Sequence, residues 1–301
     1  MLRGKDLLGL KDLSTNEIEL ILNTAKDFKA VLKSGKRTDD LIDKSVATLF
    51  YENSTRTRIS FELAAKNLGA KVTSIAVSQS SVAKGESLID TGKTLDALYT
   101  NVIIIRHNAS GAPQLLAKNV RASVINGGDG NNEHPTQGLL DIFTMRETFG
   151  KLDGLKVTLV GDIKHSRVAR SNIFGLTKLN VKVSVAAPET LVPSDICKIV
   201  RVHNNIYDAV QDSDVIMGLR IQTERQKKGL FPSMREYVKF YSITEDLIKK
   251  AKKTCLVMHP GPINRGVEIM SEVADSKQSL ILNQVSNGLA IRMAILKLIV
   301  K

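Results

Sequence analysis

Short runs of β-branched and aliphatic residues alternate with longer segments of helical periodicity along almost the whole chain. The expected strands span residues 46–51, 72–77, 102–106, 123–126, 157–160, 181–186, 215–219 and 255–258. The expected helices include residues 13–33, 56–68, 87–99 and 136–148, where apolar residues recur every three or four positions. Strands separated by helices form βαβ units, and these units build mainly parallel sheets. We therefore expect an α/β fold, and we read the residues that follow each strand for function, because ligands bind at the carboxyl ends of parallel strands.

The 301 residues are enough for two domains of ordinary size. A boundary is expected near residues 150–154, after a long helical segment and before a new strand. The prediction is two doubly wound domains, residues 1–150 and 151–284. The last helical segment, about 285–301, has no strand after it and could pack on either half; we expect it to return to the first domain.

Composition excludes several classes of protein. Hydrophobic residues make up 43% and charged residues 25% of the chain, as in soluble globular proteins. We see neither an apolar run long enough to span a bilayer nor a signal peptide, so we expect a cytoplasmic protein with no membrane partner. Cys197 and Cys255 are too few and too far apart for a disulfide framework or a paired-thiol zinc site.

The chain is basic, with 43 Lys and Arg against 31 Asp and Glu, a net charge of +12. These basic residues are spread along the chain, and aromatic residues make up only 4%. A basic surface without clusters or aromatic stacking platforms argues against nucleic acid as a partner. The charge therefore points to small anionic substrates, held by basic residues in particular loops.

Two segments imitate nucleotide-binding motifs without satisfying them. Gly92-Lys93-Thr94 ends like a P-loop, but Ser87 stands where that motif needs its first glycine. Gly161 follows a strand as in a dinucleotide fingerprint, but the second and third glycines are missing. Neither a nucleoside triphosphate nor a dinucleotide is supported.

The segment after the first expected strand has the composition of an anion site. It reads Ser54-Thr55-Arg56-Thr57-Arg58, at the point where a strand ends and a helix begins. Ser54 or Thr55 can cap that helix, and the free N–H groups of its first turn point at the same place. Hydroxyls, guanidinium groups and a helix N-terminus together favour a phosphate ligand. The alternative is a merely capped helix with exposed arginines, which would not require the Arg-Thr-Arg sequence behind the cap.

Two further strand ends in the first half supply matching groups. Arg106 follows the third strand, and a glycine-rich loop after the fourth leads to His134 and Gln137. Positions three apart lie on one helical face, so both side chains can reach one small ligand. A lone histidine is more often a packing or surface residue, but this position beside Gln137 favours a role in binding.

Strand ends in the second half carry arginines and prolines. Arg167 and Arg220 lie on two different loops and suit a ligand with two carboxylates, because guanidinium pairs with carboxylate in bidentate fashion. The segment His259-Pro260-Gly261-Pro262 follows the last strand. Its prolines constrain the backbone and leave carbonyl oxygens free to accept hydrogen bonds from a ligand amide.

Together these segments resemble the carbamoyltransferase family over nearly the whole chain, from Leu7 to the last helix. Residues 54–58 are similar to the family's carbamoyl phosphate motif. His134-Pro135-Thr136-Gln137 resembles the branch that uses aspartate, since the ornithine branch usually has cysteine in the third place. Arg220-Ile221-Gln222 stands where the ornithine branch has a Ser-Met-Gly loop. Arg220 would also attract a side-chain carboxylate and repel an ornithine ammonium group.

The resemblance implies a role for each matching residue. The first domain would bind carbamoyl phosphate and the second aspartate, with the active site in the cleft between the two domains. Carbamoyl phosphate would be held by Ser54, Thr55, Arg56, Thr57, Arg106, His134, Gln137, Gly261 and Pro262, with the backbone carbonyls near Pro260 and Gly261 on its NH2. The catalytic residues among them would be Arg56, Thr57, Arg106 and His134. Aspartate would be held by Lys84, Arg167, Arg220 and Gln222, while Glu52 and Glu224 would orient the arginines Arg167 and Arg220 across the cleft.

The implied reaction moves the carbamoyl group from carbamoyl phosphate to the α-amino group of L-aspartate, a step of pyrimidine biosynthesis. The alternative within the family is another acceptor, such as ornithine or an acylated ornithine. A non-catalytic scaffold is a rival hypothesis, but it would be expected to have lost some of these residues. No cofactor is implied, and no segment has the ligand spacing of a metal site.

The resemblance also implies a homotrimer whose active sites are shared. Ser80 and Lys84 would enter the site of the neighbouring subunit, with Ser81 as an alternative to Ser80. Whether regulatory chains or a dihydroorotase associate with such trimers is left open by the sequence.

Overall fold

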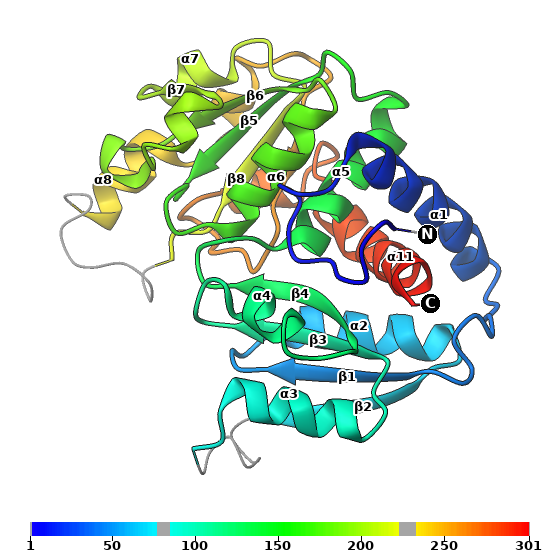
Figure 1. Ribbon diagram of the computed structural model, residues 1–301. Coiled ribbons are helices and arrows are strands. Elements are labelled where there is room, and N and C mark those ends of the chain that lie inside the picture. The colour runs from blue at the N-terminus through cyan, green and yellow to red at the C-terminus, as the bar shows by residue number, and fades with distance from the viewer. Residues whose placement is uncertain (1, 77–84, 223–232, 301) are drawn as a thin grey trace. The chain divides into compact units, whose positions relative to one another are not determined.

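The computed structural model describes residues 2–76, 85–222 and 233–300, in which helices alternate with the strands of two parallel sheets (Figure 1). The chain divides into two compact units, residues 1–143 with 286–301 and residues 144–285. Two helices, α5 (Pro135–Phe149) and α11 (Ile281–Ile299), contribute residues to both units. The predicted α/β class with doubly wound parallel sheets is confirmed.

The sheet of the first unit has the strand order β2-β1-β3-β4. Its strands are β1 (Ser45–Phe50), β2 (Lys71–Ala76), β3 (Val102–His107) and β4 (Ser123–Asp129). Its other helices are α1 (Thr15–Lys33), α2 (Thr55–Asn67), α3 (Leu88–Ala97) and α4 (Ala112–Ala117).

Helices cover both faces of this first sheet. Leu49 and Ile103 point toward Leu95 of α3 and Leu116 of α4 in one hydrophobic cluster. Thr48, one residue before Leu49, points the other way and donates to Ser74, which in turn donates to Glu62 of α2. This alternation is the two-residue period of a strand, and it places α2 on the face opposite α3 and α4.

The sheet of the second unit has the strand order β7-β6-β5-β8-β9. Its strands are β5 (Lys156–Gly161), β6 (Lys182–Ala186), β7 (Arg201–His203), β8 (Val215–Leu219) and β9 (Leu256–Met258). Its helices are α6 (Arg167–Lys178), α7 (Ile206–Val210), α8 (Met234–Tyr241), α9 (Glu245–Ile248) and α10 (Ser271–Ala274), with 3-10 turns η3 (Glu189–Leu191) and η4 (Ile196–Lys198).

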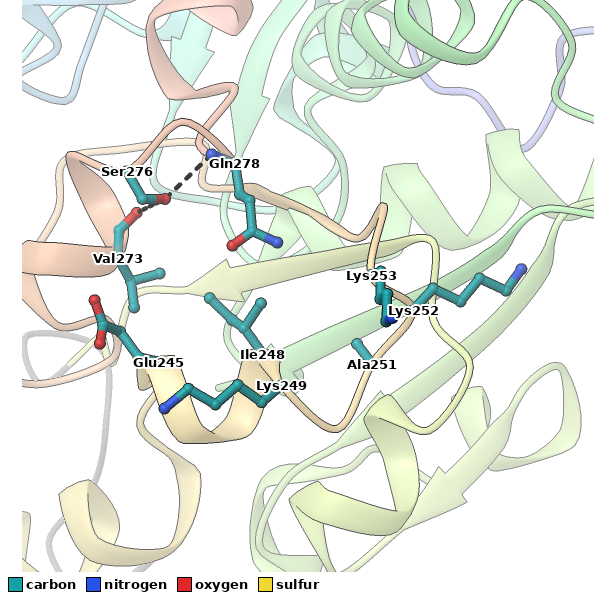
Figure 2. A pocket seen from close by; sticks show the side chains of 9 residues that line it. All are labelled: Glu245, Ile248, Lys249, Ala251, Lys252, Lys253, Val273, Ser276 and Gln278. Carbon is teal, nitrogen blue, oxygen red and sulfur yellow. Dashed lines mark hydrogen bonds between the residues drawn. The ribbon is translucent and has the colours of Figure 1, made fainter.

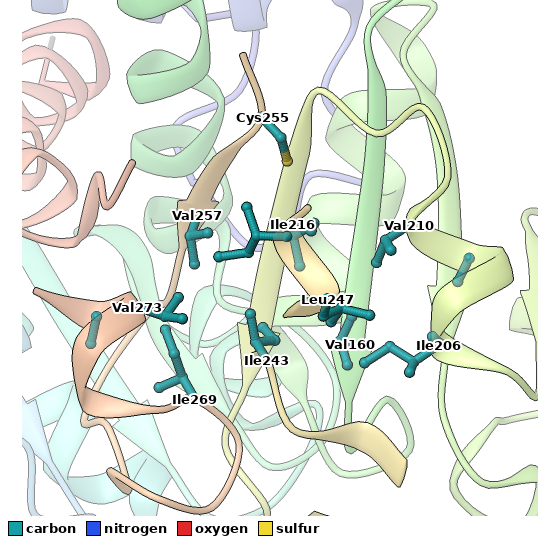
Figure 3. Packing of buried hydrophobic residues seen from close by; sticks show 14 residues of the cluster. Val160, Ile206, Val210, Ile216, Ile243, Leu247, Cys255, Val257, Ile269 and Val273 are labelled. Carbon is teal, nitrogen blue, oxygen red and sulfur yellow. The ribbon is translucent and has the colours of Figure 1, made fainter. Parts of the chain in front are cut away.

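One face of the second sheet packs against α7, α9 and α10 (Figure 3). Val160, Ile216 and Val257 come from three neighbouring strands and meet Val210, Leu247 and Val273 of these helices. Cys255 lies at the edge of the same cluster, where burial raises the pKa of its thiol to about 12. The aliphatic runs predicted at residues 157–160 and 215–219 are therefore central strands with a parallel neighbour on each side, whereas β9 lies at the edge of the sheet.

The structure differs from the sequence predictions at two strands. β7 was not predicted, because three residues, Arg201-Val202-His203, carry no recognisable period. β4 continues to Asp129, although a loop was expected from Gly127 onward. In the described part of the chain no helix is long and apolar enough to cross a bilayer.

Candidate active site

The strand order of the first unit places two of the predicted segments side by side. β1 and β3 are neighbours, and the chain leaves them toward opposite sides of the sheet. Phe50 pairs with Arg106 at their carboxyl ends, and the Tyr51 N–H donates to the Arg106 carbonyl oxygen at 2.8 Å. Such a switch point is where open α/β sheets bind ligands. The structure therefore brings residues 54–58, which follow β1, to the same edge as Arg106.

The N-terminus of α2 is open to an anion. Ser54 occupies the N-cap position with extended backbone angles, but its hydroxyl makes no capping hydrogen bond, and the first turn contains no acidic residue. By contrast, Ser14 of α1 accepts from the N–H of Glu17, an acidic residue of that helix's first turn. Uncapped N–H groups and the positive end of the helix dipole favour a bound anion at α2.

Arg106 is held at this edge by two contacts. Its Nε lies 3.3 Å from Glu52 Oε2, and one of its terminal guanidinium nitrogens donates to the Gly127 carbonyl oxygen at 3.2 Å. Glu52 belongs to the segment that follows β1, and Gly127 lies within β4, the neighbour of β3. Glu52 was expected to orient Arg167 and Arg220. In the structure it contacts Arg106 of its own unit, and the expected role remains a prediction.

Two buried carboxylates shape the loop that carries His134. Asp129 accepts from the N–H groups of Gly111 at 2.8 Å and of Glu133 at 3.2 Å. Glu133 accepts from the N–H of Leu10 at 2.7 Å, which ties the loop to the N-terminal segment. Sequence reasoning missed both carboxylates, because an acid in a glycine-rich loop is usually a surface residue.

His134 and Gln137 lie together at the start of α5. His134 precedes Pro135, the first helical residue, and its carbonyl oxygen accepts from the Gln137 N–H at 3.0 Å. Both side chains are buried, with exposures of 4% and 9%. The Gln137 amide nitrogen donates to Asp141 at 2.9 Å, so the amide oxygen is the end that remains as an acceptor.

The second unit repeats the switch-point arrangement between β5 and β8. Gly161 pairs with Leu219, so the segments 162–167 and 220–222 begin at the same edge. The sheet needs glycine here: φ is +127°, and a Cβ would lie 2.5 Å from the Leu219 carbonyl oxygen. Gly161 is therefore explained by the close packing of β5 against β8, without a dinucleotide-binding motif.

Asp162 links the two loops of this edge. It is fully buried, and its carboxylate lies 2.9 Å from His165 Nδ1 and accepts from the Gln222 N–H at 3.4 Å. Arg167 is the first residue of α6 and is buried, while Arg220 is half-buried. The structure thus gathers Arg167, Arg220 and Gln222, and it adds Asp162, which the sequence did not single out.

The loop after β9 is organised by a buried histidine. His259 Nδ1 accepts from the Gly261 N–H at 2.8 Å, and Nε2 lies 3.1 Å from Glu268. The tautomer with its proton on Nε2 satisfies both contacts. Glu268 also accepts from the Asn264 N–H at 2.7 Å. These bonds hold the turn that contains the cis peptide Gly261–Pro262.

Three residues assigned to the site lie outside the described residues: Ser80, Lys84 and Glu224. Their predicted roles are carried forward as proposals.

A pocket of about 530 Å³ lies elsewhere in the second unit, near the start of β9 (Figure 2). Ile248 and Val273 line its apolar part, and Lys249 and Lys252 lie at its rim. Both lysines have acidic partners, Asp246 at 2.8 Å and Asp214 at 2.7 Å. None of the predicted site residues lines this pocket, and it is formed at the opposite end of the strands from the switch point.

Comparisons with known proteins agree with this arrangement. Residues 5–147 match the family model "Aspartate/ornithine carbamoyltransferase, carbamoyl-P binding domain", and residues 153–299 match "Aspartate/ornithine carbamoyltransferase, Asp/Orn binding domain". An aspartate carbamoyltransferase catalytic subunit of Ruminiclostridium cellulolyticum is 59% identical, over 100% of this chain and 96% of that relative.

Solved structures of both branches have the same fold. Aspartate transcarbamoylase from Trypanosoma cruzi, in complex with carbamoyl aspartate and phosphate, has a TM-score of 0.90 at 30% identity, covering 98% of this chain and 96% of that chain. Ornithine carbamoyltransferase from Pyrococcus furiosus has a TM-score of 0.89 at 34% identity, covering 97% and 96%. Fold alone therefore does not distinguish the acceptors, and the residues of the site must do so.

Proposed function

The chain belongs to the aspartate/ornithine carbamoyltransferase family, and from that premise we propose that it transfers the carbamoyl group of carbamoyl phosphate to the α-amino group of L-aspartate. The products are N-carbamoyl-L-aspartate and phosphate. This reaction is a step of pyrimidine biosynthesis.

The observation that carries the choice of acceptor is the pair of arginines at the second switch point. Arg220 directly follows β8 and Arg167 begins α6 after the loop that follows β5, and the last residues of these strands, Leu219 and Gly161, are paired. Two guanidinium groups suit the two carboxylates of aspartate and would repel the side-chain ammonium group of ornithine. Relatives named as aspartate enzymes at 59% identity support the same acceptor.

The first unit is proposed to bind the carbamoyl donor. Its phosphate would lie at the open N-terminus of α2, where hydroxyls, N–H groups and Arg106 meet. The residues proposed to hold carbamoyl phosphate are Ser54, Thr55, Arg56, Thr57, Arg106, His134, Gln137, Gly261 and Pro262. The residues proposed to hold aspartate are Arg167, Arg220 and Gln222, together with Lys84.

The proposed reaction begins when the neutral α-amino group of aspartate attacks the carbamoyl carbon. The carbamoyl C=O becomes an oxyanion, and Thr57, Arg106 and His134 are proposed to donate hydrogen bonds to it. Its collapse breaks the bond to the phosphate oxygen, and the departing phosphate accepts the proton from the amine. Binding holds the amino group of aspartate close to the carbamoyl carbon in a reactive orientation, which removes most of the entropic cost of their encounter.

A homotrimer with shared sites, acting in the cytoplasm, completes the proposal. Ser80 and Lys84 of one subunit would enter the site of its neighbour. Exposed apolar side chains of the first unit support association: Ile59 and Leu63, four residues apart on α2, are 45% and 47% exposed.

The test is acceptor choice. The purified protein is incubated with carbamoyl phosphate labelled in its carbamoyl carbon and, separately, L-aspartate, L-ornithine and N-acetylornithine. We expect label in N-carbamoyl-L-aspartate with release of one phosphate per product. Faster transfer to ornithine or to its acetyl derivative would overturn the assignment of Arg167 and Arg220.

A further inference from the structure

Asp141 is a buried acid next to the site that the reaction scheme does not use. It lies on α5, one turn after Gln137, and its side chain is fully buried. The Gln137 amide nitrogen donates to its Oδ1 at 2.9 Å. A carboxylate can only accept hydrogen bonds, so an ionised Asp141 admits one orientation of the Gln137 amide, with the NH2 group toward Asp141.

A buried carboxylate needs a compensating charge, and the C-terminal helix supplies it. Arg292 of α11 is 4% exposed, donates to the Ser60 hydroxyl of α2 at 3.0 Å, and lies 5.0 Å from the centre of the Phe61 ring. Burial lowers the pKa of Arg292 to about 10, and attraction to Asp141 opposes that shift. Arg292 therefore remains charged at neutral pH.

α11 is shaped to bring this guanidinium to α5. A Cβ at Gly288, one turn before Arg292, would lie 2.5 Å from an Arg292 guanidinium nitrogen and 3.2 Å from Leu140, the neighbour of Asp141. Gly288 thus provides the space in which the guanidinium lies between helices. Arg292 is hydrogen-bonded to Ser60 and Gln137 to Asp141, and electrostatic attraction connects Arg292 with Asp141.

We propose that Asp141 and Arg292 are positioning residues that hold the Gln137 amide with its oxygen toward the NH2 group of carbamoyl phosphate. The site would then select a carbamoyl phosphate over an acyl phosphate, such as acetyl phosphate, which carries a methyl group in place of NH2. This inference rests on the proposed function, because it assumes that Gln137 faces the carbamoyl group. Neither residue would touch the substrate.

The decisive variant is Asp141→Asn, which keeps the size of the side chain but can donate to the Gln137 amide as well as accept from it. We measure the dissociation constants of carbamoyl phosphate, acetyl phosphate and inorganic phosphate by calorimetry. Affinity for carbamoyl phosphate is expected to fall roughly 10-fold, the effect of one misdirected buried hydrogen bond. Acetyl phosphate and inorganic phosphate, which offer no NH2, should bind as to wild type within about 2-fold.

A double-mutant cycle tests whether Asp141 acts through Gln137. Gln137→Ala should cause the same selective loss, and adding Asp141→Asn to it should cost nothing more. Arg292→Met, a change on α11, should also lower the affinity for carbamoyl phosphate selectively. Arg292→Lys should lower it less, because lysine keeps the positive charge. Asp96→Asn is the matched control, because Asp96 accepts from the Arg121 and Ala122 N–H groups in the same unit, away from α5.

The outcomes separate this proposal from the proposed function. Equal loss of affinity for all three anions in Asp141→Asn, or additive losses in the cycle, would show that Asp141 only stabilises the fold. If Asp141→Asn does not fold, the Arg292→Met and Arg292→Lys pair decides by the same criterion. A wild-type protein that binds no carbamoyl phosphate would instead reject the proposed function.

Discussion

The edge of the first sheet presents hydroxyls, helix N–H groups and Arg106, whereas the edge of the second presents Arg167, Arg220 and the amide of Gln222. Both edges are switch points between the same kind of strand pair, β1 with β3 and β5 with β8. The backbone arrangement is therefore shared, and the side chains that follow the strands differ. The first set suits a phosphate with several oxygens, and the second suits two carboxylates.

The two edges also differ in how their loops are held. In the first unit the loop before α5 is fastened by Asp129 and Glu133, which accept from backbone N–H groups of separate segments. In the second unit Asp162 contacts both loops, through His165 and the Gln222 N–H. Loss of Glu133 should therefore loosen the loop before α5, whereas loss of Asp129 or of Asp162 should each loosen two loops.

The largest effect is expected in the second unit. Arg220→Ala should raise the aspartate KM steeply, because losing a charge-assisted pair in a closed site costs about 2–5 kcal/mol. Carbamoyl phosphate affinity, which is proposed to depend mainly on residues of the first unit, should change little. Steady-state kinetics with each substrate varied measures both. Arg265→Ala is the control: it removes the same charge from the same unit at an exposed pair with Asp275. Equal losses for both substrates would remove Arg220 from this role.

His134→Ala tests the first unit. We expect kcat to fall by about 10²-fold or more, the range for a lost donor to an oxyanion. The KM for aspartate should move much less than in Arg220→Ala. His203→Ala, at the end of edge strand β7 in the other unit, is the matched histidine control. An unchanged kcat would make His134 a structural residue.

Mixing subunits tests whether the first unit's edge is completed by a neighbour. Lys84→Ala and His134→Ala should each be nearly inactive. Random reassembly makes about three quarters of trimers mixed, each with about one intact site in three, so activity should return to about a quarter of wild type. Subunit exchange is verified separately by mass. A mixture that exchanges but stays inactive would place Lys84 in its own chain's site.

The smallest expected effect concerns stability. The hydroxyl of Thr158 on β5 is within hydrogen-bond distance of the hydroxyls of Ser184 and buried Ser213 and of the Ala209 carbonyl oxygen. Thr48 holds the equivalent place on β1, but its hydroxyl donates to Ser74, which is exposed. Thr158→Val should lower the unfolding free energy by about 1–3 kcal/mol, because buried partners lose a hydrogen bond. Thr48→Val should cost about 1 kcal/mol or less.

Native-state hydrogen exchange reports each unit separately and so measures both variants of this pair. Equal losses would show that burial of the hydroxyl network does not distinguish the two sheets.

Much of the fold could be predicted because its signals are local. The run of aliphatic residues at 102–106 or 215–219 predicts a strand without knowledge of its neighbours. β7 escaped prediction because three residues are too short to show a period, and β4 was cut short because glycine is uncommon in strands. In both cases pairing with a neighbouring strand outweighed weak local preference.

The sequence by itself determined the alternation of strands and helices, and with it which residues follow each strand. It therefore identified residues 54–58, Arg106, His134, Gln137, Arg167 and Arg220, whose chemistry can be recognised one segment at a time. Only the tertiary structure decided which strand ends are neighbours, and which acids are buried. Asp129, Glu133, Asp141 and Asp162 look like surface acids in the sequence. Their roles arise from N–H groups, amides and a guanidinium contributed by distant segments, because burial is a property of the packed chain and not of the residue.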